Sequence, residues 1–406
     1  MDRATEILAT LMGRPLVADP FPLYHELREI EPVHREPNGI WYLTRLADCD
    51  RLLRSANFGH DDGDTHFAAT VAGRRATLLA LMFAFDDPPE HTRKRGLVAE
   101  PFSAAASAAY RPRVQALVDE LLDPIASGAE VDLDAMLSAR LPVLVTCELL
   151  GIPEADRDRC VGWVEMLTSS NQPVLMGDDA QRILADADAA ADLAAEYFSS
   201  LLRQRSEAPR DDILSALAPV ALAADEFTAD EIAATLILLM AAGFETTRYT
   251  ISGGLIALAE SADQWAIARH QVLVDGELSN EATEELLRHQ GPIHGSLARS
   301  SKVDEDFGGV TVPAGEPVVA MVAAGNRDPT VYERPDALDI TRTGRRPLTF
   351  GAGLHYCLGA FLARDEIKLA VGGVLARFDR LELLGPTGTK GSFNVRGPKG
   401  LRARVY

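Results

Sequence analysis

A cysteine in a glycine-rich stretch near the end of the chain is the residue best suited to chemistry. Cys357 follows Gly351 and Gly353, and Gly359 comes two residues after it. The glycines allow a close backbone approach or a positive φ. We expect a helix over Leu358–Leu369, whose dipole and first N–H groups would favour a thiolate at Cys357. Such a thiolate, with no second cysteine nearby, suits one axial bond to a haem iron.

Cys357 has a simpler alternative, because most free cysteines are small buried hydrophobic residues. The spacing Phe-x-x-Gly-x-x-x-Cys-x-Gly over residues 350–359 argues against that alternative, since few other sites need this combination. A dinucleotide-binding loop is excluded, because Tyr356 stands where its third glycine is needed. The haem-ligand interpretation of Cys357 therefore remains the stronger one.

A carboxylate beside a hydroxyl forms the second candidate. Glu245 and Thr246 lie in a helix that we expect over residues 229–258, and Gly243 precedes them. A glycine inside a helix costs about 1 kcal/mol relative to alanine, which indicates that Gly243 has a use. The alternative is a glycine packing contact with an incidental Glu-Thr pair. A positioned acid next to an alcohol can relay protons.

The elements that must hold these residues are mainly helical. The pattern predicts an α+β protein, mainly α with smaller β-sheets, and the Asn38-Gly39 pair predicts a hairpin near its start. Residues 57–85 are expected to be a long mobile connection. A helix opening at Asp87 would place His91 and Arg95 on one face. The remaining expected elements are a helix over residues 20–30, a helix over 48–53, and β-rich parts at roughly 31–45, 292–325 and 390–406.

The cysteine loop closely resembles that of the cytochrome P-450 superfamily, in its soluble bacterial class of haem-thiolate monooxygenases. The resemblance extends from about Asp19 to the C-terminus and includes the string Pro-Pro-Glu-His-Thr-Arg at residues 88–93. It implies one domain over residues 1–406. In that fold a long central helix lies over the haem and the cysteine loop lies beneath it.

The resemblance also assigns roles to particular residues. It implies that Cys357 is the axial ligand of the haem iron and that Glu245 and Thr246 are catalytic, delivering protons during oxygen activation. The residues that it implies around haem b are Cys357, His91, Arg95, Arg299, His355, Phe350, Gly351 and Gly359.

A structural pair is implied as well. Glu285 and Arg288 match the family's buried Glu-x-x-Arg, which clasps an arginine from a later loop. Ala337 stands where that arginine is usual, so Arg342 or Arg334 is expected to replace it.

The implied activity is a monooxygenase that hydroxylates or epoxidises a small, apolar secondary-metabolite substrate. The chain lacks a flavin or nicotinamide fingerprint, so electrons would come from NAD(P)H through an external reductase and ferredoxin. We expect the ferredoxin to dock on a group of basic residues near Cys357. These predicted docking cations are Arg93, Lys94, Arg345, Arg346 and Arg364.

Substrate identity, regioselectivity and the redox partner are not readable from the sequence. The residues expected by position to line a substrate pocket are Leu238, Ala241, Ala242, Ile293, Gly295 and Phe393. Oxidative coupling or ring formation, a peroxygenase, and a haem sensor without turnover are alternatives. The intact Glu245-Thr246 pair disfavours the peroxygenase and the sensor.

Composition sets the remaining bounds. The 406 residues are 47% hydrophobic and 25% charged, enough for a large core. A net charge of −20 argues against nucleic acid and against an anionic membrane surface as partners. The four cysteines show no C-x-x-C spacing, so neither zinc binding nor a disulfide framework is indicated. We expect a cytoplasmic monomer that does not insert into a membrane.

Overall fold

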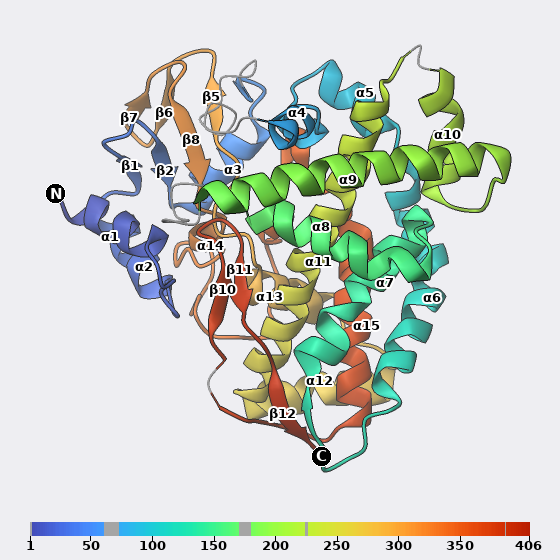
Figure 1. Cartoon of the computed structure of the whole chain (residues 1–406). Helices are drawn as coiled ribbons and strands as arrows, with labels where there is room; N and C mark the ends of the chain where they lie inside the picture. Colours follow the sequence, from blue (N-terminus) through green and yellow to red (C-terminus); the bar gives the residue numbers. More distant parts are fainter. Residues whose placement is uncertain (1, 61–72, 170–179, 224–225, 386) are drawn as a thin grey trace. The chain divides into compact units, whose positions relative to one another are not determined.

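The computed structural model describes residues 2–60, 73–169, 180–223, 226–385 and 387–406. Contacts divide the chain into two compact units. Unit 1 comprises Met1–Gly59, Ala108–Leu141 and Thr246–Tyr406, and unit 2 comprises His60–Ser107 and Pro142–Glu245. Figure 1 shows the chain coloured from its N-terminus to its C-terminus.

Helices make up most of both units. The described helices are α1 (Arg3–Met12), α2 (Phe21–Ile30), α3 (Leu46–Arg54), α4 (Arg74–Ala80), α5 (Glu90–Gly96), α6 (Ala104–Leu122), α7 (Arg140–Leu150), α8 (Arg157–Ser169), α9 (Ala180–Glu207), α10 (Ile213–Ala223), α11 (Ala229–Ala259), α12 (Ala262–Asp275), α13 (Asn280–Gln290), α14 (Val322–Gly325) and α15 (Ala360–Arg377). The described strands are β1 (Val33–Arg35), β2 (Trp41–Leu43), β3 (Phe58–Gly59), β4 (Glu130–Asp132), β5 (Arg299–Ser301), β6 (Glu305–Phe307), β7 (Val310–Val312), β8 (Pro317–Ala320), β9 (Leu381–Leu383), β10 (Thr389–Gly391), β11 (Arg396–Pro398) and β12 (Arg402–Val405).

The largest sheet of unit 1 has the strand order β1-β2-β8-β5-β3. β1 and β2 form an antiparallel hairpin with Val33 opposite Leu43, and Gly39 in its turn has a φ of +88°. β2 continues the sheet by pairing in parallel with β8. Leu43 and Val318 from these two strands are fully buried in one core cluster, so the sheet is anchored by its apolar side chains.

Helix α15 carries the chain away from the cysteine loop through the interior of unit 1. It packs against α12 and α13, and its residues Val371, Val374 and Leu375 are fully buried. A Cβ atom on Gly373 would come within 2.7 Å of Val118 Cγ1 on α6, so the two helices approach closely there. The far end of the loop is therefore attached to a rigid core element.

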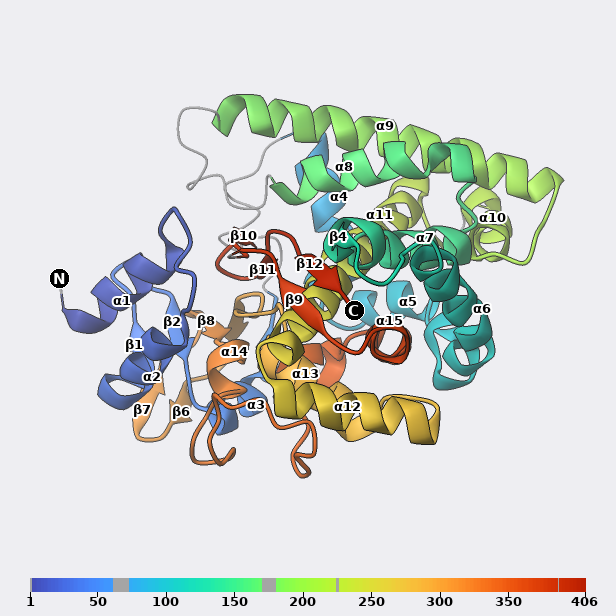
Figure 2. The ribbon, with the colours of Figure 1, turned by 90° about the horizontal axis from the view of Figure 1, so that it is seen from below.

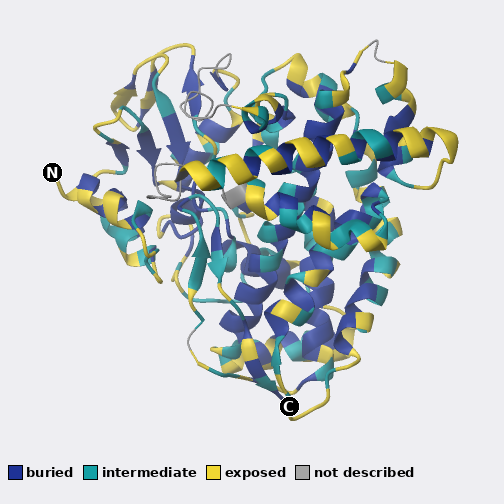
Figure 3. Cartoon of the chain, viewed as in Figure 1, coloured by how far each residue is buried: buried dark blue, intermediate teal, exposed yellow. Residues whose placement is uncertain are grey.

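Unit 2 is built around the long helix α9, which packs against α8, α10 and α4. Small residues at helical spacing, among them Ala187, Ala191 and Ala194, are buried on one face of α9 and allow this close packing. Figure 2 shows α8 running alongside α9, and Figure 3 shows exposed residues along another face of α9. In the described parts of the chain, no helix is long and apolar enough to cross a membrane.

Several expected elements differ from the observed ones. The helix after the cysteine loop begins at Ala360 rather than Leu358 and continues to Arg377. Residues 57–85, expected to form a long mobile connection, contain strand β3 and helix α4, and Leu78 on α4 is buried. Residues 61–72 of this range lie outside the described residues. Most strands fall in the expected β-rich ranges, whereas β3, β4 and β9 lie outside them. Each of these three is an edge strand of two or three residues, which is too short to show an alternating pattern in the sequence.

Candidate active site

The cysteine loop of unit 1 is shaped by two glycines. Gly351 and Gly353 both have a φ of +69°, a conformation that residues with a Cβ atom rarely adopt. The loop closes on itself through a hydrogen bond in which the Cys357 amide donates to the Phe350 carbonyl oxygen at 2.9 Å. The Ala360 amide donates to the Cys357 carbonyl oxygen at 3.4 Å, which joins the loop to α15. Cys357 thus precedes the helix by a single turn of backbone.

Cys357 differs from the other three cysteines in exposure. Cys49, Cys147 and Cys160 are buried, whereas Cys357 is half-buried. Burial raises the pKa of the Cys147 and Cys160 thiols to about 12, and it also raises the pKa of Cys49. Thiols with such raised pKa values are poor ligands and nucleophiles at neutral pH. Cys357 is therefore the cysteine placed to act as a ligand.

Arg299 and the cysteine loop meet at the end of α3. The Arg299 Nη1 group donates to the Leu53 carbonyl oxygen at 3.1 Å, and Arg299 itself is buried. A Cβ atom on Gly353 would come within 2.5 Å of the same carbonyl oxygen, so only glycine fits at that place. His355 is half-buried in the same loop. Unit 1 thus brings Arg299 close to the loop that carries His355 and Cys357.

Arg364 on α15 supports the loop from its other side. Its Nε group donates to Glu284 Oε1 at 2.6 Å, and its Nη1 group donates to the Tyr356 hydroxyl at 3.1 Å. Its guanidinium also lies over the Phe350 ring. Arg364 therefore connects the residues that precede Cys357 to the rest of unit 1.

Helix α11 has a partly exposed stripe on an otherwise buried surface. Residues 232–237 are buried, whereas Leu238, Ala241, Ala242, Glu245 and Thr246 are half-buried or exposed. Their spacing places these five residues near one face of the helix. Glu245 and Thr246 therefore present a carboxylate and a hydroxyl on an accessible face.

Gly243 has a packing role in unit 2. A Cβ atom there would come within 2.9 Å of Thr146 Oγ1 on α7, so the glycine permits α11 and α7 to approach. This contact explains the glycine without involving Glu245 or Thr246. Close packing between α11 and α7 thus offsets the cost of a glycine inside the helix. This is the glycine packing contact that the sequence left open as an alternative.

His91 and Arg95 lie one turn apart on α5 in unit 2. His91 is buried, and its ring centroid lies 6.2 Å from that of Phe83. Arg95 is half-buried. The two cationic or hydrogen-bonding side chains therefore share one helical face, as the spacing predicts.

Glu285 and Arg288 form a buried bidentate ion pair. Arg288 Nε and Nη2 donate to the two Glu285 carboxylate oxygens at 2.7 and 2.8 Å. Arg342 Nε completes the arrangement by donating to Glu285 Oε2 at 3.1 Å. Arg342, rather than Arg334, thus takes the place of the arginine that the loop lacks at Ala337.

The residues expected to line a substrate pocket are placed differently in the two units. In unit 1, Ile293 is half-buried and pairs with Val395 in an isolated β-bridge, whereas Gly295 is buried against Phe393 and Asn394. Phe393 is only 5% exposed and belongs to a core cluster. In unit 2, Leu238, Ala241 and Ala242 belong to the stripe on α11.

The structure reduces the set of docking cations. Lys94 is buried, with Nζ 2.8 Å from Asp86 Oδ2, so it was wrongly included. Arg93 bonds to Glu90 and Glu231, and Arg364 is largely enclosed by the contacts described above. Arg345 and Arg346 remain exposed.

Arg364, which was expected on the docking surface, instead supports the cysteine loop. A sequence signal was present, because Arg364 lies on the helix that follows the loop and seven residues after Cys357, about two helical turns. Its partner Glu284 is 80 residues earlier in the chain, and no local pattern connects the two residues.

Comparisons with known proteins show the family of the chain. The family model for cytochrome P450 matches residues 60–387. The chain is 35% identical over 372 residues to cytochrome P450 107B1 of Saccharopolyspora erythraea, covering 89% of this chain and 88% of the relative. It has the same identity and coverage with the mycinamicin IV hydroxylase/epoxidase of Micromonospora griseorubida.

A solved structure shows the same fold. The structure of P450BioI in complex with an acyl carrier protein ligated to hexadec-9Z-enoic acid superposes with a TM-score of 0.84 at 29% identity, covering 95% of this chain and 98% of that chain. The fold is therefore the single-domain, mainly helical P450 fold with small sheets. The relatives are named as hydroxylases and monooxygenases, which supports an enzyme rather than a sensor. The chain belongs to the cytochrome P450 family and is a P450 monooxygenase.

Proposed function

We propose that this enzyme hydroxylates or epoxidises a small organic secondary metabolite, with Cys357 as the axial ligand of haem b. The half-buried Cys357 on its closed loop, the one accessible thiol among the four cysteines, carries this proposal. Homologues that act on secondary metabolites support the substrate class. The single domain over residues 1–406 is part of the same proposal.

The residues of each unit fit a haem. Gly359 has a φ of −83°, and a Cβ atom there would meet no protein atom within 4 Å. Neither the backbone conformation nor a neighbouring protein atom therefore requires a glycine at this position. A flat group bound close to the backbone, such as a haem, would account for it. Gly351 and Phe350 would complete that face. In unit 2, His91 and Arg95 are cationic or hydrogen-bonding groups suited to a carboxylate such as a haem propionate. In unit 1, Arg299 and His355 are groups of the same kind.

The side chains on α11 would manage protons. A haem with a thiolate ligand, when bound, supplies the activation of dioxygen. Glu245 lies half-buried on the accessible stripe, so its carboxylate can take a proton from water and pass it on. The neighbouring Thr246 hydroxyl can both accept and donate a hydrogen bond, so it would accept a proton's hydrogen bond from one side and donate its own to the other. On α11, Leu238, Ala241 and Ala242 would exclude water and contact an apolar substrate. In unit 1, the half-buried Ile293 is a further candidate for such a contact.

Electrons would come from NAD(P)H through a reductase and a ferredoxin. Arg346 and Arg345 are exposed, and Arg345 is paired with Asp50, with Nη2 2.8 Å from Oδ2. Leu354 and Phe361 near the cysteine loop are 45% and 47% exposed. An apolar centre beside exposed cations suits a small acidic partner. We call these four residues the donor surface.

The first experiment is the absorption spectrum of the dithionite-reduced protein with carbon monoxide. We expect a strongly red-shifted Soret band in the wild type and in Cys160→Ala, a control that removes a buried thiol. Cys357→Ala should lose that band. A red-shifted band that survives in Cys357→Ala would contradict the assignment of the ligand.

A further inference from the structure

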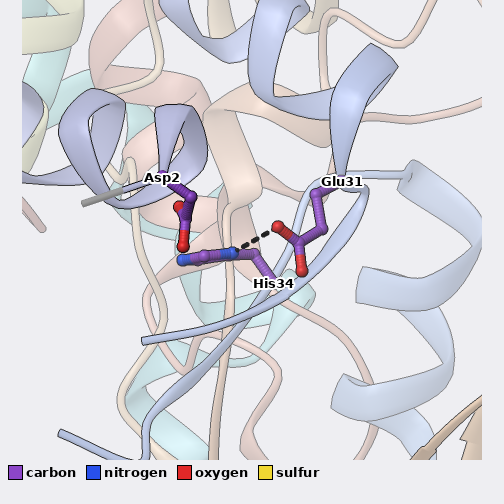
Figure 4. A group of neighbouring side chains, drawn as sticks. All are labelled: Asp2, Glu31 and His34. Carbon is purple, nitrogen blue, oxygen red and sulfur yellow. Dashed lines mark hydrogen bonds and ion pairs between the residues drawn. The ribbon is translucent and has the colours of Figure 1, made fainter. Parts of the chain in front are cut away.

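A cluster of metal-ligating side chains lies at the start of unit 1, apart from the cysteine loop. Asp2 caps α1, Glu31 caps the C-terminus of α2, and His34 lies in β1. One ligand atom from each residue lies within 4.8 Å of the other two. Figure 4 shows the Asp2 and Glu31 carboxylates on opposite sides of the His34 ring. Among the described residues, this is the one group of three such side chains so arranged.

Both nitrogens of the His34 ring face carboxylate oxygens. Nδ1 lies 2.8 Å from Glu31 Oε2, and Nε2 lies 3.2 Å from Glu36 Oε1. A neutral imidazole carries one N–H group and one lone pair, so it can donate to only one of these oxygens. The other contact would set a nitrogen lone pair against a carboxylate. A cation bound at that nitrogen would remove this unfavourable contact.

Local charge favours a divalent ion over a second proton. Asp2, Glu31 and Glu36 place three carboxylates around one imidazole. A proton on the ring adds one positive charge, whereas a divalent cation adds two and bonds directly to oxygen and nitrogen. His34 is only 2% exposed, so its ring is held in place, while Glu31 is about half exposed and can adjust.

We propose that Asp2, Glu31 and His34 bind a borderline divalent cation such as Zn²⁺. Imidazole with carboxylates is a common ligand set for zinc, with bonds of about 2.0–2.2 Å. In tetrahedral geometry such bonds place the ligand atoms about 3.3 Å from one another. The exposed carboxylates must therefore shift to reach this spacing, and Glu31 Oε2, now 2.8 Å from Nδ1, would move outward if Nδ1 binds the ion. Asp2 Oδ1 accepts from the Thr5 amide, and the carboxylate has a second oxygen to offer the ion.

The ion would connect three elements of unit 1. Asp2 is the N-cap of α1, Glu31 ends α2, and His34 is paired through β1 to the sheet. Binding to these three residues would fix α1 on the hairpin. We therefore expect zinc to raise the melting temperature as well as to bind.

The test uses the haem-loaded, full-length protein without an affinity tag, treated with a chelator and then dialysed. Zinc chloride is titrated by calorimetry at neutral pH. We expect one zinc per chain, and we expect Asp2→Asn and Glu31→Gln each to raise Kd by at least about tenfold. Asn is as good an N-cap as Asp, so Asp2→Asn should leave α1 intact. Glu29→Gln is the matched control, because Glu29 is exposed on α2 outside the cluster.

Two results would overturn the proposal. The first is zinc binding that Asp2→Asn and Glu31→Gln leave unchanged, because the ion would then lie elsewhere. The second is the absence of binding together with a His34 ring that nitrogen NMR shows to be doubly protonated. The cluster would in that case be an ion pair between an imidazolium and carboxylates.

Discussion

The guanidinium of Arg364 stacks on the ring of Phe350, with Cζ 4.4 Å from the ring centroid. Phe350 accepts the hydrogen bond from the Cys357 amide, and Tyr356, which precedes Cys357, accepts one from Arg364. Arg364 therefore holds the residues before the cysteine in position and places a positive charge near it. Glu284 compensates that charge through its ion pair with Arg364.

This arrangement predicts opposite shifts in the reduction potential of the bound haem. Arg364→Met removes a positive charge and should lower the potential, whereas Glu284→Gln removes a negative charge and should raise it. The shifts should be on the order of tens of millivolts, since a unit charge about 10 Å away at an effective dielectric of about 20 contributes about 1–2 kcal/mol. Spectroelectrochemical titration measures both, with Arg402→Met on exposed β12 as the control. Shifts in the same direction would indicate a disturbed loop instead of a charge effect.

Gly353 and Gly359 should respond differently to a Cβ atom. Gly353→Ala strains a positive φ and collides with the Leu53 carbonyl, so it should destabilise the fold by about 1–3 kcal/mol even without haem. Gly359→Ser retains a favourable N-cap residue for α15 and meets open space, so the haem-free protein should keep its melting temperature. It should nevertheless lose haem faster. Equal haem retention in Gly359→Ser and wild type would argue against a haem at this face.

Glu245→Gln and Thr246→Ala should uncouple electron consumption from product formation. We expect product formed per NADH consumed to fall, and turnover to product to drop by roughly 10²-fold, because positioned proton transfer contributes this much. Product, NADH and hydrogen peroxide are measured together. Thr247→Val is the control, since Thr247 is buried on another face of α11. Normal coupling in Thr246→Ala would remove the residue from the proton path.

Charge reversal on the donor surface should weaken the ferredoxin interaction. Arg345→Glu with Arg346→Glu should raise the apparent KM for ferredoxin at low salt, because an acidic partner is then repelled. The difference should shrink as salt screens the charges. Each single reversal, Arg345→Glu or Arg346→Glu, is compared with Arg402→Glu, which makes the same change in net charge at an exposed position on β12. An unchanged KM at low salt would contradict this docking surface.

Glu366 on α15 predicts a pH-dependent stability. Burial, and secondarily the charge of Asp365, raise the pKa of the Glu366 carboxyl from 4.5 to about 8. The unfolded chain therefore loses this proton near pH 4.5 and the folded protein only near pH 8. The contribution of Glu366 to stability is full below about pH 4.5 and declines as the pH rises to about 8, by a few kcal/mol at most.

Glu366→Gln removes this titration. The melting temperature of the variant relative to wild type should therefore rise between about pH 5 and about pH 8. Glu260→Gln, at an exposed position at the end of α11, should show no such trend. A constant difference across this pH range would mean that Glu366 does not titrate there.

The sequence by itself identified the family and the candidate chemistry-bearing residues. The loop from Phe350 to Gly359 and the Glu245-Thr246 pair are local patterns, so spacing was enough to find them. The hairpin at Gly39 and the helix that carries Glu245 were likewise predicted, because turn chemistry and apolar periodicity act over neighbouring residues.

Only the tertiary structure decided contacts between residues far apart in the chain. Arg342 rather than Arg334 completes the Glu285 clasp, Lys94 is buried against Asp86, and Arg364 supports the cysteine loop through Glu284. The acidic partner of each basic residue lies far away in the sequence or in another element, so the exposure and the ion pairs of these basic residues could not be predicted. The same holds for the metal-ligating cluster, because the fold brings Asp2 and His34 together although 31 residues separate them in the chain.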